Sequence, residues 1–339
     1  MMFSLNTNSI RSVLKRRGAR AISPMDLPKY TMDQFGLRAI NFSTDQLAGL
    51  TPKDLELIRD SGDRIGCSCL LVSQTEPLER GDVKGDKALE GIERMTRVLK
   101  AASLMGCNAV SVSIKSKDSD AAFEQATESM KHILHQADRA EINVLVSPMK
   151  GLTEDPERLT DLLKGIGGFR IGTMPDFVTS TESGDPVAYL KKITPYASVV
   201  NASTLGFDFP EPEEVDESAP VESESQPVDK AVPSTDEPVS EVAAAVDQLE
   251  ADLAKEDGAG APGELSGLAA LAAELEEMML EDDPVPVHVG YELPPLVGAI
   301  AAVGFDGTIS LDYRGDGDGT LGVIHAKEAI EAALEALKD

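Results

Sequence analysis

The sequence predicts a single (β/α)8 TIM barrel that is interrupted once by a long acidic insertion. Short apolar segments alternate with segments of helical periodicity, as in parallel strands joined by crossover helices. Without the segment 207–289 about 255 residues remain, the usual size of one such barrel. An open doubly wound sheet is the alternative. No GxGxxG or GxxxxGK[ST] phosphate loop follows a predicted strand, which counts against its nucleotide-binding versions.

The segment 207–289 differs from the rest of the chain in charge. It holds 24 Asp and Glu residues, two Lys and no Arg, so it carries −22 of the chain's net −28 and leaves −6 for the remainder. Many prolines and low hydrophobicity predict disorder, at 207–238 above all. Apolar residues at helical spacing suggest two short helices, at 241–254 and 264–280, which either dock on a protein partner or on the barrel, or belong to a solvated spacer. We therefore expect a barrel domain, 1–206 plus 290–339, and an insertion that follows strand seven.

Each predicted strand is a short apolar run, and several predicted helices have clear end signals. Thr51 and Pro52 are suited to begin a helix as its N-cap and first residue, Asp185 is suited to cap another, and Gly304 to end one. The predicted strands are Phe3–Asn6, Leu37–Phe42, Cys67–Ser73, Ala109–Ile114, Asn143–Ser147, Phe169–Thr173, Ser198–Ala202 and Thr308–Asp312. The predicted helices span about Lys87–Leu104, Ser119–Ala140, Glu154–Ile166, Pro186–Ile193, Pro295–Val303 and Val323–Leu337, besides those near Ile10–Arg17 and after Thr51.

The N-terminal run has a competing interpretation. Residues 1–25 contain five basic residues and no acidic one, which is the composition of a mitochondrial transit peptide. We favour a first strand at Phe3–Asn6, because the barrel needs eight strands.

Composition also limits which partners the protein can bind and indicates the redox state of its compartment. No apolar run is long enough to cross a bilayer, and the acidic chain would repel nucleic acid and anionic membranes. Cys67 and Cys69 lie on one face of a predicted strand, and Cys107 makes the count odd. We expect buried free thiols in a reducing compartment and hence a soluble cytoplasmic protein.

In a (β/α)8 barrel the active site is built at the carboxyl ends of the strands. The predicted ends here are polar, which is a general property of barrel mouths. They are Asn6, Ser43, Gln74 with Glu76, Lys115, Ser147, Asp176, Asn201 and Asp312 with Arg314.

Four of these segments carry a resemblance to a known family. INVLVSP (142–148), RIGTMPDF (170–177), VVNAS (199–203) and GFDGTISLDYRGDGD (304–318) resemble the second half of the xylose isomerase-like TIM barrels, the sugar phosphate isomerases and epimerases. The resemblance covers 1–206 and 290–339. It implies one divalent metal held by Glu, Asp, His and Glu after strands five to eight, with the two glutamates moving a proton between sugar carbons.

Carried over position by position, this ligand set is incomplete. The strand-five glutamate falls on Ser147, the strand-six aspartate is kept as Asp176, the histidine falls on Asn201, and the last glutamate falls on Asp312. The family's lysine two residues after the histidine falls on Ser203. Serine and asparagine are neutral, weak ligands, so we expect at most weakly held Mg²⁺ or Mn²⁺ at Asp176 and Asp312, and no other cofactor.

Two functions of different classes remain open. The first is a sugar isomerase or epimerase that acts on a small carbohydrate by proton transfer, with Asp176 and Asp312 as catalytic groups. The second is a non-catalytic barrel that binds a sugar-like ligand or a protein partner. The candidate substrate-binding residues in both are Asn6, Lys115, Ser147, Lys150, Asn201 and Arg314. Two carboxylates converging on one open point would favour a metal site, whereas Arg314 or Lys150 filling that point would exclude it.

Overall fold

The computed structural model describes residues 1–15, 22–80, 86–209 and 285–338. They belong to one compact unit, Met1–Pro210 with Val285–Asp339. The helices predicted at 241–254 and 264–280 lie outside the described residues, and so does most of the disorder predicted at 207–238. At 207–208 that prediction is wrong, because these residues belong to a short strand.

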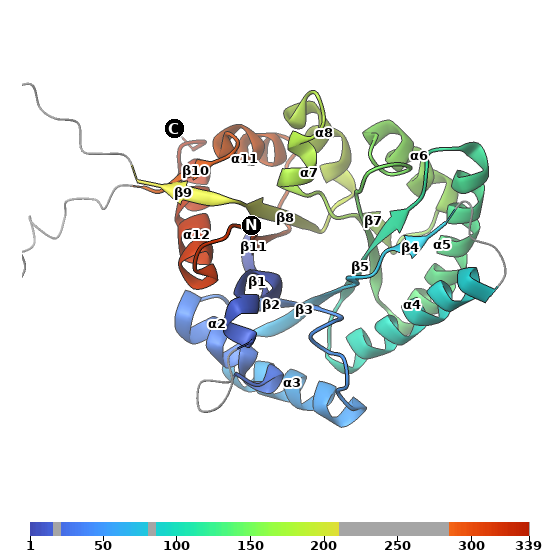
Figure 1. The fold of residues 1–339 in the computed structure, drawn as a ribbon, viewed down its shortest axis with the longest axis horizontal. Helices are drawn as coiled ribbons and strands as arrows, with labels where there is room; N and C mark the ends of the chain where they lie inside the picture. Colours follow the sequence, from blue (N-terminus) through green and yellow to red (C-terminus); the bar gives the residue numbers. More distant parts are fainter. Residues whose placement is uncertain (16–21, 81–85, 210–284, 339) are drawn as a thin grey trace, which may run out of the picture. The chain divides into compact units, whose positions relative to one another are not determined.

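Eight parallel strands form the sheet at the centre of the molecule, and helices surround it in Figure 1. Adjacent strands pair in the order β7-β6-β5-β3-β2-β1-β11-β8. Two parallel bridges, Thr173 to Ala197 and Asp176 to Asn201, join the two ends of that order. The predicted barrel fold is therefore confirmed. Its strands are β1 (Met2–Asn6), β2 (Ala39–Ser43), β3 (Ser68–Ser73), β5 (Ala109–Lys115), β6 (Asn143–Ser147), β7 (Ile171–Thr173), β8 (Val199–Thr204) and β11 (Thr308–Tyr313).

The helices begin and end where side chains satisfy the free backbone groups of their terminal turns. Thr51 and Asp54 form a reciprocal capping box, and Asp185 accepts a hydrogen bond from the backbone N–H of Ala188. Gly304 adopts φ +72° after the penultimate helix, as predicted. The helices are α1 (Arg11–Leu14), α2 (Leu27–Phe35), α3 (Pro52–Ile65), α4 (Asp86–Leu104), α5 (Asp120–Ala140), α6 (Pro156–Ile166), α7 (Phe177–Thr181), α8 (Pro186–Ile193), α11 (Leu293–Ala302) and α12 (Gly319–Glu335). None of these described helices is long and apolar enough to span a membrane.

The two faces of the barrel strands carry different side chains. The outward face packs against the helices in one large apolar cluster that includes Leu5, Ile40 and Val200. Since side chains alternate along a strand, every second residue points inward. On β3, β5, β6 and β8 the interior holds a small apolar group around Leu71 and Leu145. On β1, β2 and β11 most inward side chains are polar: Asn41 Nδ2 donates to Ser4 Oγ and Ser310 Oγ, both at 2.9 Å.

The N-terminal strand and the cysteines agree with the sequence analysis. β1 lies between β2 and β11, so the first strand is confirmed. Cys67, Cys69 and Cys107 are free and buried. Burial raises the pKa of Cys67 and of Cys69 to about 12, and the pKa of Cys107 also lies well above the ordinary value. These thiols remain protonated and serve as apolar core groups.

The sequence analysis missed three short strands. β4 (Leu78–Glu79) pairs with β5, and β9 (Gly206–Asp208) pairs antiparallel with β10 (Val287–Val289). Apart from Gly206, the β9–β10 hairpin lies within the segment 207–289 that was assigned to the insertion. Its register pairs Asp208 with Val287, so the chain entering the insertion lies beside the chain leaving it.

Because of that hairpin, we predict that the barrel is stable without residues 210–284. Replacement of 210–284 by a short Gly/Ser linker should leave the melting temperature within a few degrees, because the hairpin already closes the loop and loop length changes closure entropy only slowly. Calorimetry of the two proteins measures the shift. Loss of the cooperative transition in the shortened chain would show that the deleted segment is needed for the barrel.

Candidate active site

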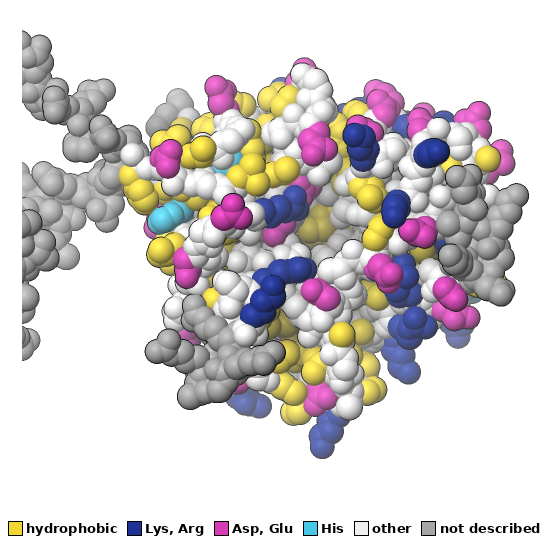
Figure 2. Space-filling model, in the orientation of Figure 1, with side chains coloured by type: hydrophobic (Ala, Val, Ile, Leu, Met, Phe, Trp, Pro, Cys, Tyr) yellow, Lys and Arg dark blue, Asp and Glu magenta, His cyan; other side chains and the backbone are white. Residues whose placement is uncertain are grey.

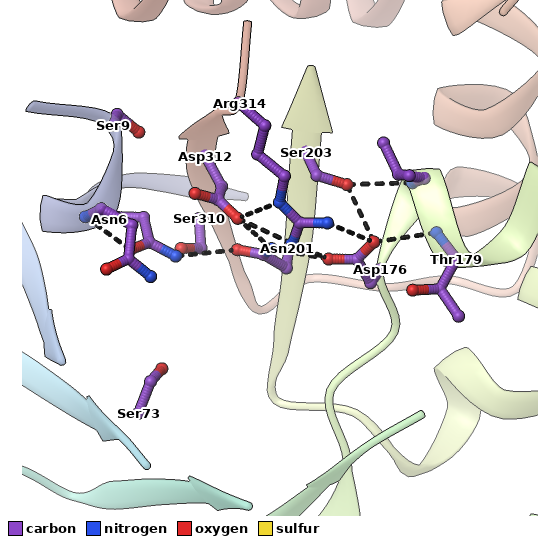
Figure 3. A network of polar contacts seen from close by, with 12 residues as sticks. Asn6, Ser9, Ser73, Asp176, Thr179, Asn201, Ser203, Ser310, Asp312 and Arg314 are labelled. Atoms are coloured by element: carbon purple, nitrogen blue, oxygen red, sulfur yellow. Dashed lines mark hydrogen bonds and ion pairs between the residues drawn. The ribbon is translucent and has the colours of Figure 1, made fainter. Parts of the chain in front are cut away.

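The predicted site residues from the last three barrel strands meet in one polar network (Figure 3). Asp176 follows β7 and is the N-cap of α7, where its Oδ1 accepts from the backbone N–H of Thr179 at 2.9 Å. Asn201 lies on β8, and Asp312 lies on β11. The parallel register places Asn201 beside Ser310 and Ser203 beside Asp312. Strand order and pleat therefore aim these side chains at the carboxyl end of the barrel.

Asn201 joins the two carboxylates through one amide group. Its Nδ2 donates to Asp176 Oδ2 and to Asp312 Oδ2, both at 2.8 Å. Its Oδ1 accepts from Asn6 Nδ2 at 3.2 Å, which links β1 to the network. Ser203 Oγ donates to Asp176 Oδ1 at 2.9 Å. The amide nitrogen, a donor, thus faces the carboxylates at the position that the family resemblance assigns to a histidine ligand.

Arg314 supplies the positive charge between the two carboxylates. Its Nε donates to Asp312 Oδ2 at 2.9 Å, its Nη1 to Asp176 Oδ1 at 3.3 Å, and its Nη2 forms ion pairs with both. The side chains of Asp176 and Asp312 are 9% and 3% exposed, against 39% for Arg314. The guanidinium therefore covers a buried pair of like charges that would repel each other strongly without it.

The electrostatics of Asp176 and Arg314 agree with this geometry. Burial alone would raise the pKa of Asp176, but the charge of Arg314 and the hydrogen bonds from Asn201, Thr179 and Ser203 outweigh it, so the pKa lies below the ordinary value. Burial alone would lower the pKa of Arg314, yet the two aspartates raise it above its usual range. Both groups are held in their charged forms.

These residues do not fit a firmly bound divalent metal. A metal needs several lone pairs aimed at one point, and here a guanidinium and an amide N–H point at the shared carboxylate oxygens. Across the described ranges, no three His, Cys, Asp or Glu side chains lie close enough together to hold a metal ion. Arg314 thus fills the point between Asp176 and Asp312.

The other predicted substrate-binding residues lie apart from this network. Ser147 ends β6, and its side chain makes no hydrogen bond to the network residues within the described chain. Lys115 ends β5, and Lys150 follows β6; both line a separate pocket together with Arg80. Asn6, Asn201 and Arg314 are brought together with the aspartates, whereas Lys115, Ser147 and Lys150 are not.

Two supporting residues were missed because they lie at the edge of the insertion. Tyr291 Oη donates to the carbonyl oxygen of Ser203. The two ring nitrogens of His288 contact two backbone groups: Nε2 accepts from the N–H of Leu205 at 2.9 Å, and Nδ1 lies 2.9 Å from the carbonyl oxygen of Tyr291. Burial lowers the pKa of His288, so the neutral ring is favoured. No sequence pattern linked these aromatic residues to β8.

A polar pocket of about 530 Å³ opens beside Arg314. Its wall combines Asp312 and Arg314 with the turn after β1 and the glycine-rich turn after β11. The lining residues are Asn8, Ser9, Arg11, Ser12, Asp312, Tyr313, Arg314, Gly315, Asp316 and Gly317. Asp312 Oδ1 has no hydrogen-bond partner among the described residues and exposes less than 1 Å² to water. A ligand in this pocket would meet hydroxyl, amide, carboxylate and guanidinium groups.

Comparison with protein families gives one match. The model of the "Xylose isomerase-like TIM barrel" family matches residues 32–339. No curated protein sequence is a significant match to the chain.

Solved structures share the fold at low sequence identity. An L-ribulose 3-epimerase has a TM-score of 0.65 and 10% identity, covering 100% of this chain and 96% of its own. A D-tagatose 3-epimerase-like protein has a TM-score of 0.62 and 12% identity, covering 100% and 98%. The IolI protein, solved with a bound zinc atom, has a TM-score of 0.57 and 10% identity, covering 99% and 98%.

Proposed function

This chain belongs to the xylose isomerase-like TIM barrel family, and we propose that it binds a small carbohydrate or other polyol at the barrel mouth without a resident divalent metal. The observation that carries the proposal is the guanidinium of Arg314 between Asp176 and Asp312. The arginine places one permanent positive charge between the two carboxylates, where a divalent metal would place two, and it offers no open coordination position for a substrate oxygen. Its guanidinium group instead places hydrogen-bond donors beside a polar pocket.

The non-catalytic alternative is favoured over proton transfer by the chemistry of the two aspartates. Movement of a proton between two carbons needs titratable groups that take and give a proton near the working pH. The pKa of Asp176 lies below its usual range, so its carboxylate is a weak base. The position implied for the second base holds Ser147, a hydroxyl without a hydrogen bond to the network.

An isomerase or epimerase remains the second candidate, because both carboxylates are kept side by side and the fold is that of sugar epimerases. Deuterium uptake from D2O into ketohexoses, followed by NMR with EDTA or with Mn²⁺, separates the two functions. Proton transfer exchanges a carbon-bound hydrogen even when net conversion is slow. We expect no exchange in either condition. Exchange in either one would establish proton transfer by an isomerase or epimerase, and exchange only with Mn²⁺ would make it metal-dependent.

Binding itself is tested by ligand-detected NMR with ketohexoses and inositols. We expect saturation transfer to at least one polyol that is unchanged by EDTA, and loss of it in Ser12→Trp, which fills the pocket from the exposed face of α1. Ser68→Trp is the control, because Ser68 is exposed and begins β3 at the opposite end of the barrel. Failure of the whole panel to bind, or equal loss in both variants, would contradict the proposal.

We retain a cytoplasmic location as part of this proposal, on the three buried free thiols. A protein partner for the acidic segment also stays a proposal, since 210–284 lies outside the described residues.

A further inference from the structure

A second pocket, of about 410 Å³, lies at the carboxyl ends of other barrel strands and is distinct from the Asp176–Arg314 network. It is formed where β4 and β5 end and where the chain leaves β6. Its lining residues are Glu79, Arg80, Lys115, Ser116, Lys117, Lys150 and Gly151. Lys115 and Lys150, which the sequence analysis assigned to substrate binding, meet here.

The pocket is positively charged in a net-acidic protein. Four of its seven lining residues are cations, and one is a carboxylate. That carboxylate, Glu79, pairs with Lys115 at 3.2 Å, but both side chains are more than half exposed, so the pair holds the lysine only weakly. Lys117 and Lys150 form no ion pair with any residue in the described ranges. Such a concentration of one charge raises the local concentration of the opposite ion.

One of the four cations is fixed inside the fold. Arg80 is 4% exposed, and its Nε donates to Ser129 Oγ on α5 at 2.7 Å. Its backbone N–H donates to the carbonyl of Lys115 at 3.0 Å. Burial, and to a lesser extent the charge of Arg94, lowers the pKa of Arg80 to about 10. A negative group in the pocket would offset both effects, because opposite charge favours the ionised guanidinium.

The backbone under Lys117 and Lys150 is also held in place. Leu152 N donates to the carbonyl of Ser116 at 3.1 Å, which ties the loop after β6 to the end of β5. Gly151 has φ +106°, and a Cβ there would lie 2.0 Å from Ser116 O. Only glycine allows this approach of the two loops. Figure 2 shows Lys and Arg side chains, with Asp and Glu side chains among them, on the viewed face of the described molecule.

We propose that this pocket binds the phosphate group of a small phosphorylated metabolite. Three ammonium groups beside a buried guanidinium suit a compact dianion, and the ammonium groups can donate hydrogen bonds to its oxygens. A carboxylate shares the oxyanion chemistry but carries less charge, so it should bind more weakly. The proposal does not depend on the polyol pocket beside Arg314.

The test is a titration with inorganic phosphate at constant ionic strength, followed by protein NMR. We expect saturable shifts at the ends of β5 and β6, and at least ten-fold weaker binding, about 1.4 kcal/mol, in Lys117→Gln/Lys150→Gln. These two lysines are exposed and make no ion pair with described residues, so the fold should tolerate the change. Lys53→Gln/Lys100→Gln, on α3 and α4, removes the same charge elsewhere and should change the affinity less than two-fold.

Three results separate the possibilities. Acetate that binds as tightly as phosphate would keep the oxyanion site but assign it to carboxylates. If phosphate affinity fell equally in the pocket variant and the control variant, binding would depend only on the overall charge of the protein, and the proposed site would be wrong. Absence of saturable phosphate binding in the parent would also overturn it. Polyol binding should be the same in all three proteins, so failure here is distinguishable from failure of the proposed function.

Discussion

Arg314→Met should lower the free energy of unfolding by about 2–4 kcal/mol at pH 7, because it leaves two buried carboxylates side by side without their cation. The range allows for the partial exposure of the arginine, which weakens each of its ion pairs. Both aspartates would still accept hydrogen bonds from the amide of Asn201, but that amide is uncharged and does not offset their negative charges. Urea unfolding of parent and variant measures the difference.

Arg158→Met is the matched control. Arg158 also bridges two aspartates, Asp118 at 3.0 Å and Asp120 at 2.9 Å, but those carboxylates are 53% and 96% exposed. Water stabilises them when the arginine is removed, so we expect a loss of at most about 1 kcal/mol. A similar loss in both variants would show that the Arg314 cluster is no more than a surface ion pair.

The two proteins should respond to pH in opposite directions. In the parent, the pKa of Asp176 is below its usual range, so its stabilising contribution is present above pH of about 4 and is lost as the pH falls further. In Arg314→Met the repulsion raises the pKa of one carboxyl above its unfolded value, so that carboxyl favours folding at low pH and opposes it as the pH rises. The stability gap should therefore narrow between pH 7 and pH 5, and a gap that stays constant would contradict the like-charge explanation.

The second large effect is a gain of metal affinity. Ser147→Glu/Asn201→His/Arg314→Ser replaces the two neutral residues by strong ligands and removes the guanidinium from between Asp176 and Asp312. We expect Mn²⁺ to bind at least about 100-fold more tightly than to the parent. Loss of the groups that merely hydrogen-bond to metal ligands already changes metal affinity by up to about 100-fold, and here two ligands themselves are added. Calorimetric titration with Mn²⁺ gives the affinities.

The variant that keeps the arginine is the control for this experiment. Ser147→Glu/Asn201→His should gain much less, because the positive charge of Arg314 still lies where the metal must enter. Equal gains in both variants would show that Arg314 is no obstacle. Weak binding in both would show that position 147 does not converge with the other three.

Much of the fold could be predicted because the signals are local. All eight barrel strands lie within two residues of their predicted ends, since each is an apolar run bounded by turn residues, and the caps at Thr51 and Asp185 are sequence features. The β9–β10 hairpin was missed because its strands are three residues long and border an acidic segment.

The candidate site could be predicted only in part. Asp176, Asn201 and Asp312 were identified because strand ends in a barrel face one mouth. Arg314 could be named only as a candidate for substrate binding or for the point between the two carboxylates, because nothing in the sequence identifies its partners. Its contact with Asp176 joins side chains 138 positions apart. That contact depends on the barrel closing between β7 and β8, which no local pattern encodes.

Anomalous diffraction at the manganese edge, from crystals of the parent protein soaked in MnCl2, tests the central claim most directly. If Arg314 takes the place of a metal, the map will show the guanidinium between Asp176 and Asp312 and no manganese peak there. A manganese ion ligated by both aspartates, with Arg314 displaced into the pocket, would contradict the account and restore metal-dependent chemistry to this barrel.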